Sequence, residues 1–184
     1  MKNGLIVVAH PDDETIWMGG MILNKTNWNW TILSLCRASD INRAPKFKRV
    51  CDQYGAQSII LDLEDYKLDP IDKNIILNLI KDNLDRLKFD VIFTHGENGE
   101  YGHIRHKEVH FAVRELIEKK YLKCQEVYYF AYYKEDPEFK FQLSDEEFRK
   151  KKDIITKIYG FNEDSFEAKE CKKEELFDIV KLKK

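Results

Sequence analysis

Short apolar segments alternate with longer helical patterns along this chain, and that alternation restricts the possible folds more than any other feature. Five segments rich in β-branched or aromatic residues are predicted to be strands, at 4–9, 31–36, 58–63, 90–94 and 126–131. A continuous apolar run such as the first is typical of a strand buried on both faces of a sheet. The aromatic content of the last segment indicates a strand at the sheet edge.

Helical patterns separate these strands, at 15–24, 46–54, 72–87 and 104–119. In the third pattern, apolar residues such as Ile76, Leu79 and Ile80 recur at spacings of three and four. Because strand and helix alternate, we expect an α/β fold with a largely parallel sheet and helices on both faces.

A single domain suits a chain of 184 residues, since domains span roughly 100–200 residues. We expect an α/β core over about 1–133, up to Tyr133. A charged, mainly helical segment follows over 134–184, where 27 of 51 residues are charged. Ser144 and Glu147 predict a capped helix start, and this helix is expected to run over 145–159 and to end at Gly160. The rest of the segment is interpreted as an appendage, a partner surface or a partly frayed end.

Composition excludes several classes of protein. The formal net charge of −2 argues against binding to nucleic acid or to an anionic membrane surface. The longest apolar run, from Leu5 to Ala9, is far shorter than the ~20 residues of a transmembrane helix. It also ends too early for a signal peptide, so we expect a cytoplasmic protein with reduced cysteines and no integral membrane segment. The oligomeric state stays open, a homo-oligomer included.

Histidine and carboxylates follow the first predicted strand, in the run His10-Pro-Asp-Asp-Glu14. Ligands of parallel sheets bind at the carboxyl ends of strands, and His95 directly follows the fourth strand, so both groups are expected on one rim. Imidazole and carboxylate are zinc ligands, and a second carboxylate can act as a base. The alternative is that Asp12 or Asp13 only caps the next helix.

Four of the five histidines lie between positions 95 and 110, and His103, His106 and His110 share one predicted helix face. The alternative is a polar helix face with solvated histidines. Combined with the first cluster, they supply two histidines and a carboxylate and leave a fourth position for water, which is the pattern of catalytic zinc. The surplus carboxylate, histidine and tyrosine would then move a proton and stabilise charge on the substrate.

Two motifs give the chain a family resemblance. Val8-Ala-His-Pro-Asp-Asp-Glu14 and Glu100-Tyr-Gly-His-Ile-Arg-His106 resemble motifs of the PIG-L/LmbE family of zinc-dependent N-acetylglucosaminyl de-N-acetylases, over about residues 4–113. The resemblance implies an LmbE-like fold, a Rossmann-like three-layer αβα sandwich with a mostly parallel central sheet. It also implies a hydrolase that removes the N-acetyl group of a GlcNAc-type amino sugar or its glycoconjugate by attack of a metal-bound water.

The resemblance assigns roles to single residues: three bind the metal, one is the general base and two stabilise charge on the amide. These are His10, Asp13 and His106 for the metal, Asp12 as the base, and His103 and Tyr101 for the charge. Zn²⁺ is expected, although the ligand set also suits Fe²⁺ or another divalent ion.

Departures from the family motifs concern the substrate. Many members have Pro-Asp where this chain has Ile104-Arg105. Arg105 is interpreted as a contact to an anionic substrate group or as a solvated side chain. Arg43 is a candidate for binding a phosphate or carboxylate. His95 is a candidate substrate contact or a neighbour of the metal ligands.

Two other functions stay open at this point. A metal-dependent hydrolase of another bond, such as a phosphoester, would use His95 and His110 to complete a second metal site. A non-catalytic sugar-binding relative would keep the fold and lose the chemistry.

Overall fold

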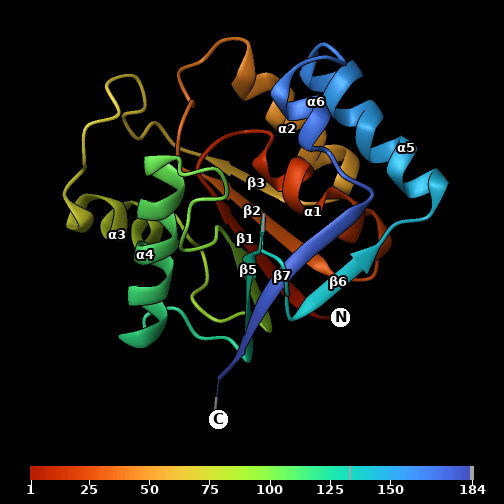
Figure 1. The fold of residues 1–184 in the computed structure, drawn as a ribbon. Coiled ribbons are helices and arrows are strands. Elements are labelled where there is room, and N and C mark those ends of the chain that lie inside the picture. The colour runs from red at the N-terminus through yellow and green to blue at the C-terminus, as the bar shows by residue number, and fades with distance from the viewer. Residues whose placement is uncertain (133, 183–184) are drawn as a thin grey trace.

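The computed structural model describes residues 1–132 and 134–182. Tyr133, where the composition changes, and Lys183 and Lys184 lie outside the described residues. Among the described residues, seven strands form one sheet in the order β3-β2-β1-β4-β5-β7-β6 (Figure 1). The strands are Asn3–Val8 (β1), Asn29–Ser34 (β2), Gln57–Ile60 (β3), Val91–Thr94 (β4), Glu126–Phe130 (β5), Phe139–Gln142 (β6) and Glu174–Lys181 (β7). β1 to β5 pair in parallel, and β7 pairs antiparallel with β5 and β6.

Helices cover both faces of this sheet (Figure 1). The helices are Asp13–Asn24 (α1), Arg43–Tyr54 (α2), Lys73–Asp82 (α3), Ile104–Glu118 (α4), Asp145–Asp153 (α5), the π-helix Ile154–Tyr159 (η1) and Phe166–Glu170 (α6). One core packs α3 and α4 against the sheet, and the other packs α1, α2 and the C-terminal helices against its opposite face. The predicted three-layer α/β sandwich with a mostly parallel sheet is thereby confirmed. Among the described residues, none of the helices combines the length and apolar character needed to cross a membrane.

The segment after position 133 differs from its prediction. It contributes β6 and β7 to the sheet, and Tyr159 and Phe177 to the core, so it is an integral part of the fold rather than an appendage. β5 is therefore not the predicted edge strand, because β7 pairs along its free side. The helix start at Ser144 does carry the predicted capping box with Glu147, and the helical stretch ends at Gly160.

A buried ion pair joins this segment to α1. The Lys151 ammonium lies 2.7 Å from the Glu175 carboxylate, and both side chains are fully buried. The two carboxylate oxygens of Glu175 accept backbone N–H groups of Gly20 (2.7 Å) and Met21 (2.9 Å). These N–H groups follow a kink at Met18, where the backbone leaves the helical conformation. Glu175 thus acts as a cap inside α1 and holds the bent helix against β7.

The order of the strands brings the two predicted clusters together. β1 and β4 are parallel neighbours, with Val7 opposite Thr94, so the residues that follow both strands emerge at the same edge. The chain runs from β1 toward β2 and β3 on one side, and β4 and β5 lie on the other. Such a switch in strand order opens a crevice at the carboxyl ends of the strands.

Candidate metal centre and active site

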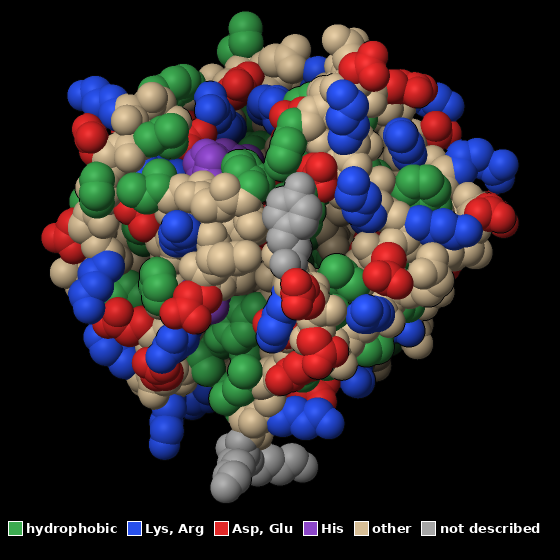
Figure 2. All heavy atoms as spheres, in the orientation of Figure 1, with side chains coloured by type: hydrophobic (Ala, Val, Ile, Leu, Met, Phe, Trp, Pro, Cys, Tyr) green, Lys and Arg blue, Asp and Glu red, His purple; other side chains and the backbone are tan. Residues whose placement is uncertain are grey.

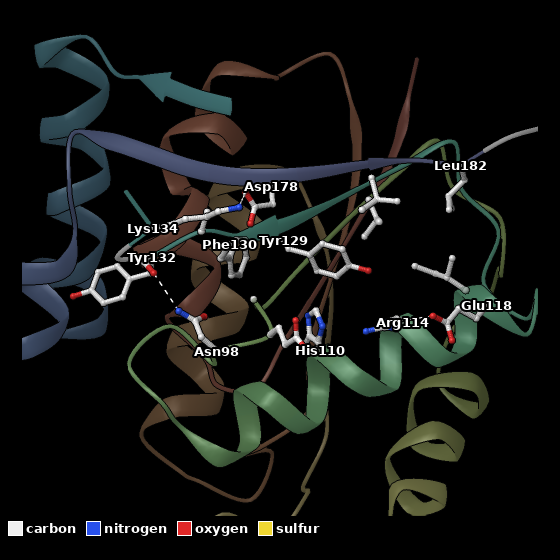
Figure 3. A pocket seen from close by; sticks show the side chains of 16 residues that line it. Asn98, His110, Arg114, Glu118, Tyr129, Phe130, Tyr132, Lys134, Asp178 and Leu182 are labelled. Carbon is white, nitrogen blue, oxygen red and sulfur yellow. Dashed lines mark hydrogen bonds and ion pairs between the residues drawn. The ribbon is translucent and has the colours of Figure 1, made fainter. Parts of the chain in front are cut away.

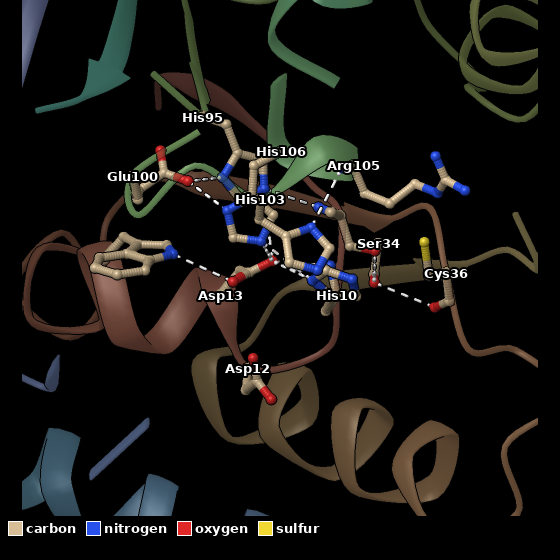
Figure 4. A network of polar contacts seen from close by, with 12 residues as sticks. His10, Asp12, Asp13, Ser34, Cys36, His95, Glu100, His103, Arg105 and His106 are labelled. Carbon is tan, nitrogen blue, oxygen red and sulfur yellow. Dashed lines mark hydrogen bonds and ion pairs between the residues drawn. The ribbon is translucent and has the colours of Figure 1, made fainter. Parts of the chain in front are cut away.

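Histidine and carboxylate side chains meet at the carboxyl ends of β1 and β4, where they come from the segments after these strands and from the first turns of α1 and α4 (Figure 4). Figure 2 shows histidine side chains at the surface in the upper part of this face, among hydrophobic, acidic and basic neighbours. A cavity of about 210 Å³ opens onto them. Its lining includes His10, Asp12, Asp13, Tyr101 and His103 of the predicted site.

The three predicted metal ligands form a compact triangle of donor atoms. His10 Nδ1 lies 3.3 Å from Asp13 Oδ2, His106 Nε2 lies 3.4 Å from the same oxygen, and the two nitrogens are 3.2 Å apart. Zinc held tetrahedrally at 2.0–2.1 Å places its ligand atoms about 3.3–3.4 Å from one another. The side chains present therefore fit a zinc ion without rearrangement of these three atoms. The second oxygen of Asp13 accepts the indole N–H of Trp17 at 3.2 Å, while Oδ2 accepts the His10 backbone N–H at 2.8 Å and keeps one lone pair for the metal side.

A buried glutamate orients one of these histidines. Glu100 Oε2 accepts from Nδ1 of His106 at 2.5 Å and from Nδ1 of His95 at 2.7 Å. With the proton on Nδ1, His106 presents the lone pair of Nε2 to the metal position. Metal-ligating histidines commonly donate their other N–H to a carboxylate in this way.

A second carboxylate stands behind the other histidine ligand. Asp65 Oδ1 lies 3.1 Å from Nε2 of His10, and its Oδ2 pairs with Arg37 at 2.6 Å. Oδ1 is buried and meets no hydrogen-bond donor in favourable geometry. Each histidine of the donor triangle thus has its own carboxylate on the side away from the metal position.

The two histidines of the triangle differ in basicity. Burial lowers the pKa of His106 to about 4, so its ring is neutral at pH 7. Burial also lowers the pKa of His10, but Asp13 and Asp65 outweigh it and raise this pKa to about 10. For Glu100, burial raises the pKa, but His95 and His106 outweigh it and hold the pKa at about 2.

Asp12 lies beside the triangle with its carboxylate in the cavity. The backbone there has φ of +113°, which is uncommon for a residue other than glycine and turns the side chain out of the helix that follows. Its Oδ2 pairs with Arg43, whose guanidinium also donates to the Pro11 carbonyl at 3.2 Å. Burial, together with the charge of Asp13, raises the pKa of Asp12 well above its ordinary value, against the opposing charges of Arg43 and His10.

His103 and Tyr101 form the opposite wall of the cavity. The Nδ1 of His103 accepts the Arg105 backbone N–H at 3.2 Å and so caps α4. The ring meets that of His10 edge to face, with centroids 4.8 Å apart. Tyr101 packs its ring on Phe166 from α6, with centroids 4.8 Å apart. The N-cap role fixes the His103 ring where it faces the metal ligands.

The three residues expected to contact substrate lie in different surroundings. Arg43 lines the cavity, but its guanidinium is engaged by Asp12. Arg105 is fully buried outside the cavity, and its guanidinium pairs with Glu64 and Glu108. It is therefore neither solvated nor directed at substrate, and instead ties the loop after β3 to α4.

His95 is likewise fully buried. It accepts the Ala9 backbone N–H on Nε2 at 2.9 Å, and its ring stacks on that of His106 with centroids 3.9 Å apart. This position matches a neighbour of the ligands and not a substrate contact.

His110 faces a different part of the molecule. Its ring lines a cavity of about 740 Å³ between α4 and the β5–β7 pair, together with Tyr129 and Arg114 (Figure 3). Its Nδ1 bonds to the His95 carbonyl at 2.9 Å. Among the described residues, none of the clusters with metal-ligand spacing includes His110, so it does not join His95 in the second metal site of the alternative function. The lining of this larger cavity contains two ion pairs, Lys134 with Asp178 and Arg114 with Glu118.

Two carboxylates of the site were missed in the sequence analysis. Glu100 was part of the second motif but received no role, although a metal-binding histidine calls for a carboxylate partner. Asp65 lies in the loop after β3, the same rim as His10, and that position was the available signal. The bond between Asp65 and Arg37 could not be inferred, because Arg37 follows a different strand.

The fold is a mostly parallel α/β sandwich. Histidines and carboxylates gather at the carboxyl ends of β1 and β4, as in α/β proteins that bind ligands at this edge of the sheet. A family model described as PIG-L, GlcNAc-PI de-N-acetylase, matches residues 5–117, which include all of these groups. The chain belongs to the PIG-L family.

Comparison with individual proteins adds the following likenesses. An uncharacterized protein of Acanthamoeba polyphaga mimivirus is 25% identical over 123 residues, which are 57% of this chain and 53% of that protein. The chain thus spans about half the length of the curated relative it matches. The 4-carboxy-2-hydroxymuconate hydratase of Pseudomonas putida has a similar fold (TM-score 0.69, 16% identity, 93% of this chain and 83% of that chain). So does a deacetylase of teicoplanin biosynthesis (TM-score 0.66, 12% identity, 86% of this chain and 84% of that chain).

Proposed function

We propose that this protein is a zinc-dependent amidohydrolase that removes the N-acetyl group from a GlcNAc-type amino sugar or its glycoconjugate. The observation that carries the proposal is the donor triangle of His10, Asp13 and His106, with edges of 3.2–3.4 Å, beside the carboxylate of Asp12. Membership of a family described as GlcNAc-PI de-N-acetylases supports the same reaction class. The fold alone does not decide it, since a hydratase shares that fold.

His10, Asp13 and His106 would hold the metal. When bound, zinc supplies a Lewis acid for the acetamide carbonyl and lowers the pKa of water to about 7. Glu100 and Asp65 keep the two histidine rings turned so that one nitrogen of each faces the metal position.

Asp12 takes the proton from the attacking water. It lies in the cavity next to Asp13, and Arg43 fixes the direction of its carboxylate. Its raised pKa brings the carboxylate closer to the range in which a general base works at neutral pH.

His103 and Tyr101 act on the amide. Because His103 accepts a backbone N–H on Nδ1, its neutral ring carries the proton on Nε2 and can donate it to the nitrogen that leaves. Burial raises the pKa of Tyr101, so its hydroxyl stays protonated and can donate to the acetamide oxygen. Water adds its hydroxyl to the carbonyl carbon, the C–N bond breaks, and acetate and a free amine result.

The test is release of acetate by the zinc-loaded protein from a panel of GlcNAc glycosides. Turnover that disappears when a chelator removes the metal, and returns when zinc is added back, supports the proposal. Full zinc occupancy with no acetate from any member of the panel would contradict it.

A further inference from the structure

We propose that the substrate carries no anionic group next to its acetamido sugar, and that the aglycone is uncharged or bears an amine. This inference rests on the proposed function, because it concerns the same cavity. It reverses the expectation that Arg43 or Arg105 holds a phosphate or carboxylate.

Every arginine around the cavity already has a carboxylate partner. Arg37 pairs with Asp65 at 2.6 Å and lies over the ring of Tyr66. Arg43 pairs with Asp12, the proposed base. Among the described residues, these two arginines are the only Lys or Arg side chains in the cavity lining. An anion bound there would compete with the carboxylate of a partly buried ion pair, and at Arg43 it would displace the proposed base from its position.

Carboxylates outnumber these cations. The lining contains five of them, which are Asp12, Asp13, Asp40, Asp65 and Glu167. With two arginines and a divalent metal in place, the formal charge of the lining remains negative by one. A cleft lined mainly by negative groups attracts positively charged ligands and repels negatively charged ones. The negative lining therefore does not repel an ammonium group or a neutral sugar, but it does repel a phosphate.

An aromatic pair at the wall also points to what the cavity accepts. Tyr101 and Phe166 expose 45% and 43% of their surface and stand edge to face at the cavity wall. Exposed aromatic faces pack against the apolar faces of ligands and attract cations.

Glu167 completes this wall on the side of α6. It lines the cavity and, within the part of the chain that the structure describes, its carboxylate has no ion-pair partner. A sugar ring packed on Tyr101 and Phe166 would therefore have a carboxylate beside it and no cation. This arrangement fits an aglycone with a free amine better than one with an acid.

The experiment uses three β-glycosides of GlcNAc that differ only in the charge of the aglycone: methyl, 2-aminoethyl and carboxymethyl. Acetate release by the zinc-loaded protein is measured at low and at high ionic strength. We expect kcat/KM for the carboxymethyl glycoside to be at least about 10-fold below that of the other two, with a gap that narrows as salt screens the charges.

A charge reversal at the wall gives a second measurement. Glu167→Lys should narrow the gap between the carboxymethyl and methyl glycosides, or invert it. Glu163→Lys makes the same charge change at an exposed residue outside the cavity lining and should leave the gap as it is.

The outcomes separate this inference from the proposed function. Equal or faster turnover of the carboxymethyl glycoside overturns the inference and leaves the deacetylase intact. A gap that both lysine variants change equally also overturns it, because the effect would then not come from the wall. Failure of all three glycosides with full zinc occupancy overturns the proposed function, and this inference with it.

Discussion

Residues 5–117, which the family model covers, and residues 134–182 build different parts of the same site. The first region carries every donor of the proposed metal triangle, the proposed base and the two residues proposed to act on the amide. The second region carries none of these groups, but its side chains position α1 and form part of the cavity wall. Tyr159 donates to Glu14 at 2.8 Å, Glu175 caps the kink of α1, and Phe166 forms part of the cavity wall. The chemistry thus comes from strand ends, while the shape of the cavity depends on distant sequence. Variants in the two regions should fail in different ways.

Asp12→Asn, in the first region, should have the largest effect. The amide cannot take a proton from water, so kcat should fall at least about 10²-fold, the low end for a positioned acid or base. Zinc content per chain should not change, because Asp12 is outside the donor triangle. Acetate release and metal analysis on the same preparation check both statements. A parallel loss of zinc would mean that Asp12 is itself a ligand.

Lys151→Met, in the second region, should damage stability rather than chemistry. It leaves the carboxylate of Glu175 buried without its partner, which costs about 3–5 kcal/mol of the free energy of unfolding. Urea denaturation measures this loss, and kcat should stay near the original value wherever the variant remains folded. The control is Lys150→Met, whose pair with Glu146 is exposed to solvent and therefore contributes little to the free energy of unfolding. Equal losses in the two variants would disprove the role of the buried pair.

Glu100→Gln should weaken metal binding. Its Oε2 accepts from both His95 and His106 and its Oε1 accepts the Gly96 backbone N–H, whereas glutamine offers a single acceptor oxygen and no charge for these three N–H groups. Loss of such a partner typically lowers metal affinity about 10–100-fold. Competition with a chromophoric chelator measures the affinity. Glu97→Gln, an exposed change in the same loop, is the matched control, and unchanged affinity in Glu100→Gln would refute the orienting role.

Metal affinity should also depend on pH through one histidine of the triangle and not the other. His10, with a pKa of about 10, must lose a proton to bind metal between pH 6 and 8, whereas His106, with a pKa of about 4, is already neutral. Protons therefore compete with the metal at low pH, and affinity should rise about tenfold per pH unit. Calorimetry in buffers of different ionisation enthalpy should show release of one proton. A metal affinity that is constant between pH 6 and 8 would show that His10 does not have to lose a proton when the metal binds.

Phe161→Leu should give the smallest effect. The Arg43 guanidinium lies 4.5 Å from the centroid of this ring, so the second region supports the arginine that fixes Asp12. Loss of a partly exposed cation–π contact is worth about 0.5–1 kcal/mol, or a two- to fivefold drop in kcat/KM. Phe111→Leu changes an exposed ring on α4 outside this cavity and serves as the control. A drop in kcat/KM as large as that of Asp12→Asn would contradict the different roles assigned to the two regions.

Sequence reasoning succeeded for the fold where apolar residues are continuous or recur at helical spacing, which covers β1 to β4 and α1 to α4. It missed β7 because Glu175 occupies the buried face next to Phe177 and breaks the alternation of that strand. A buried carboxylate becomes acceptable only through its partner Lys151, which comes from α5. Pairings of this kind between distant residues leave no local pattern.

The same limit applies to the site. His10, Asp13 and His106 lie together as the strand ends and the family resemblance implied, and their roles stay predictions. Arg43 was a candidate for binding an anion, and Arg105 was interpreted as an anion contact or a solvated side chain, because the sequence does not reveal their carboxylate partners. Glu100 and Asp65 were not recognised among 33 acidic residues, since only their contacts with histidines distinguish them.

The cap inside α1 has a consequence for the order in which the molecule acquires its final form. Glu175 and Gly20 are 155 positions apart, so their bond closes one of the longest loops in the fold. Contacts with such separation form late, because the entropy of closing the loop must be overcome before they contribute. The first turn of α1, which carries Asp13, belongs to a helix whose bend is fixed only when β7 enters the sheet. A folding chain should therefore acquire its central strands before it acquires a competent metal site.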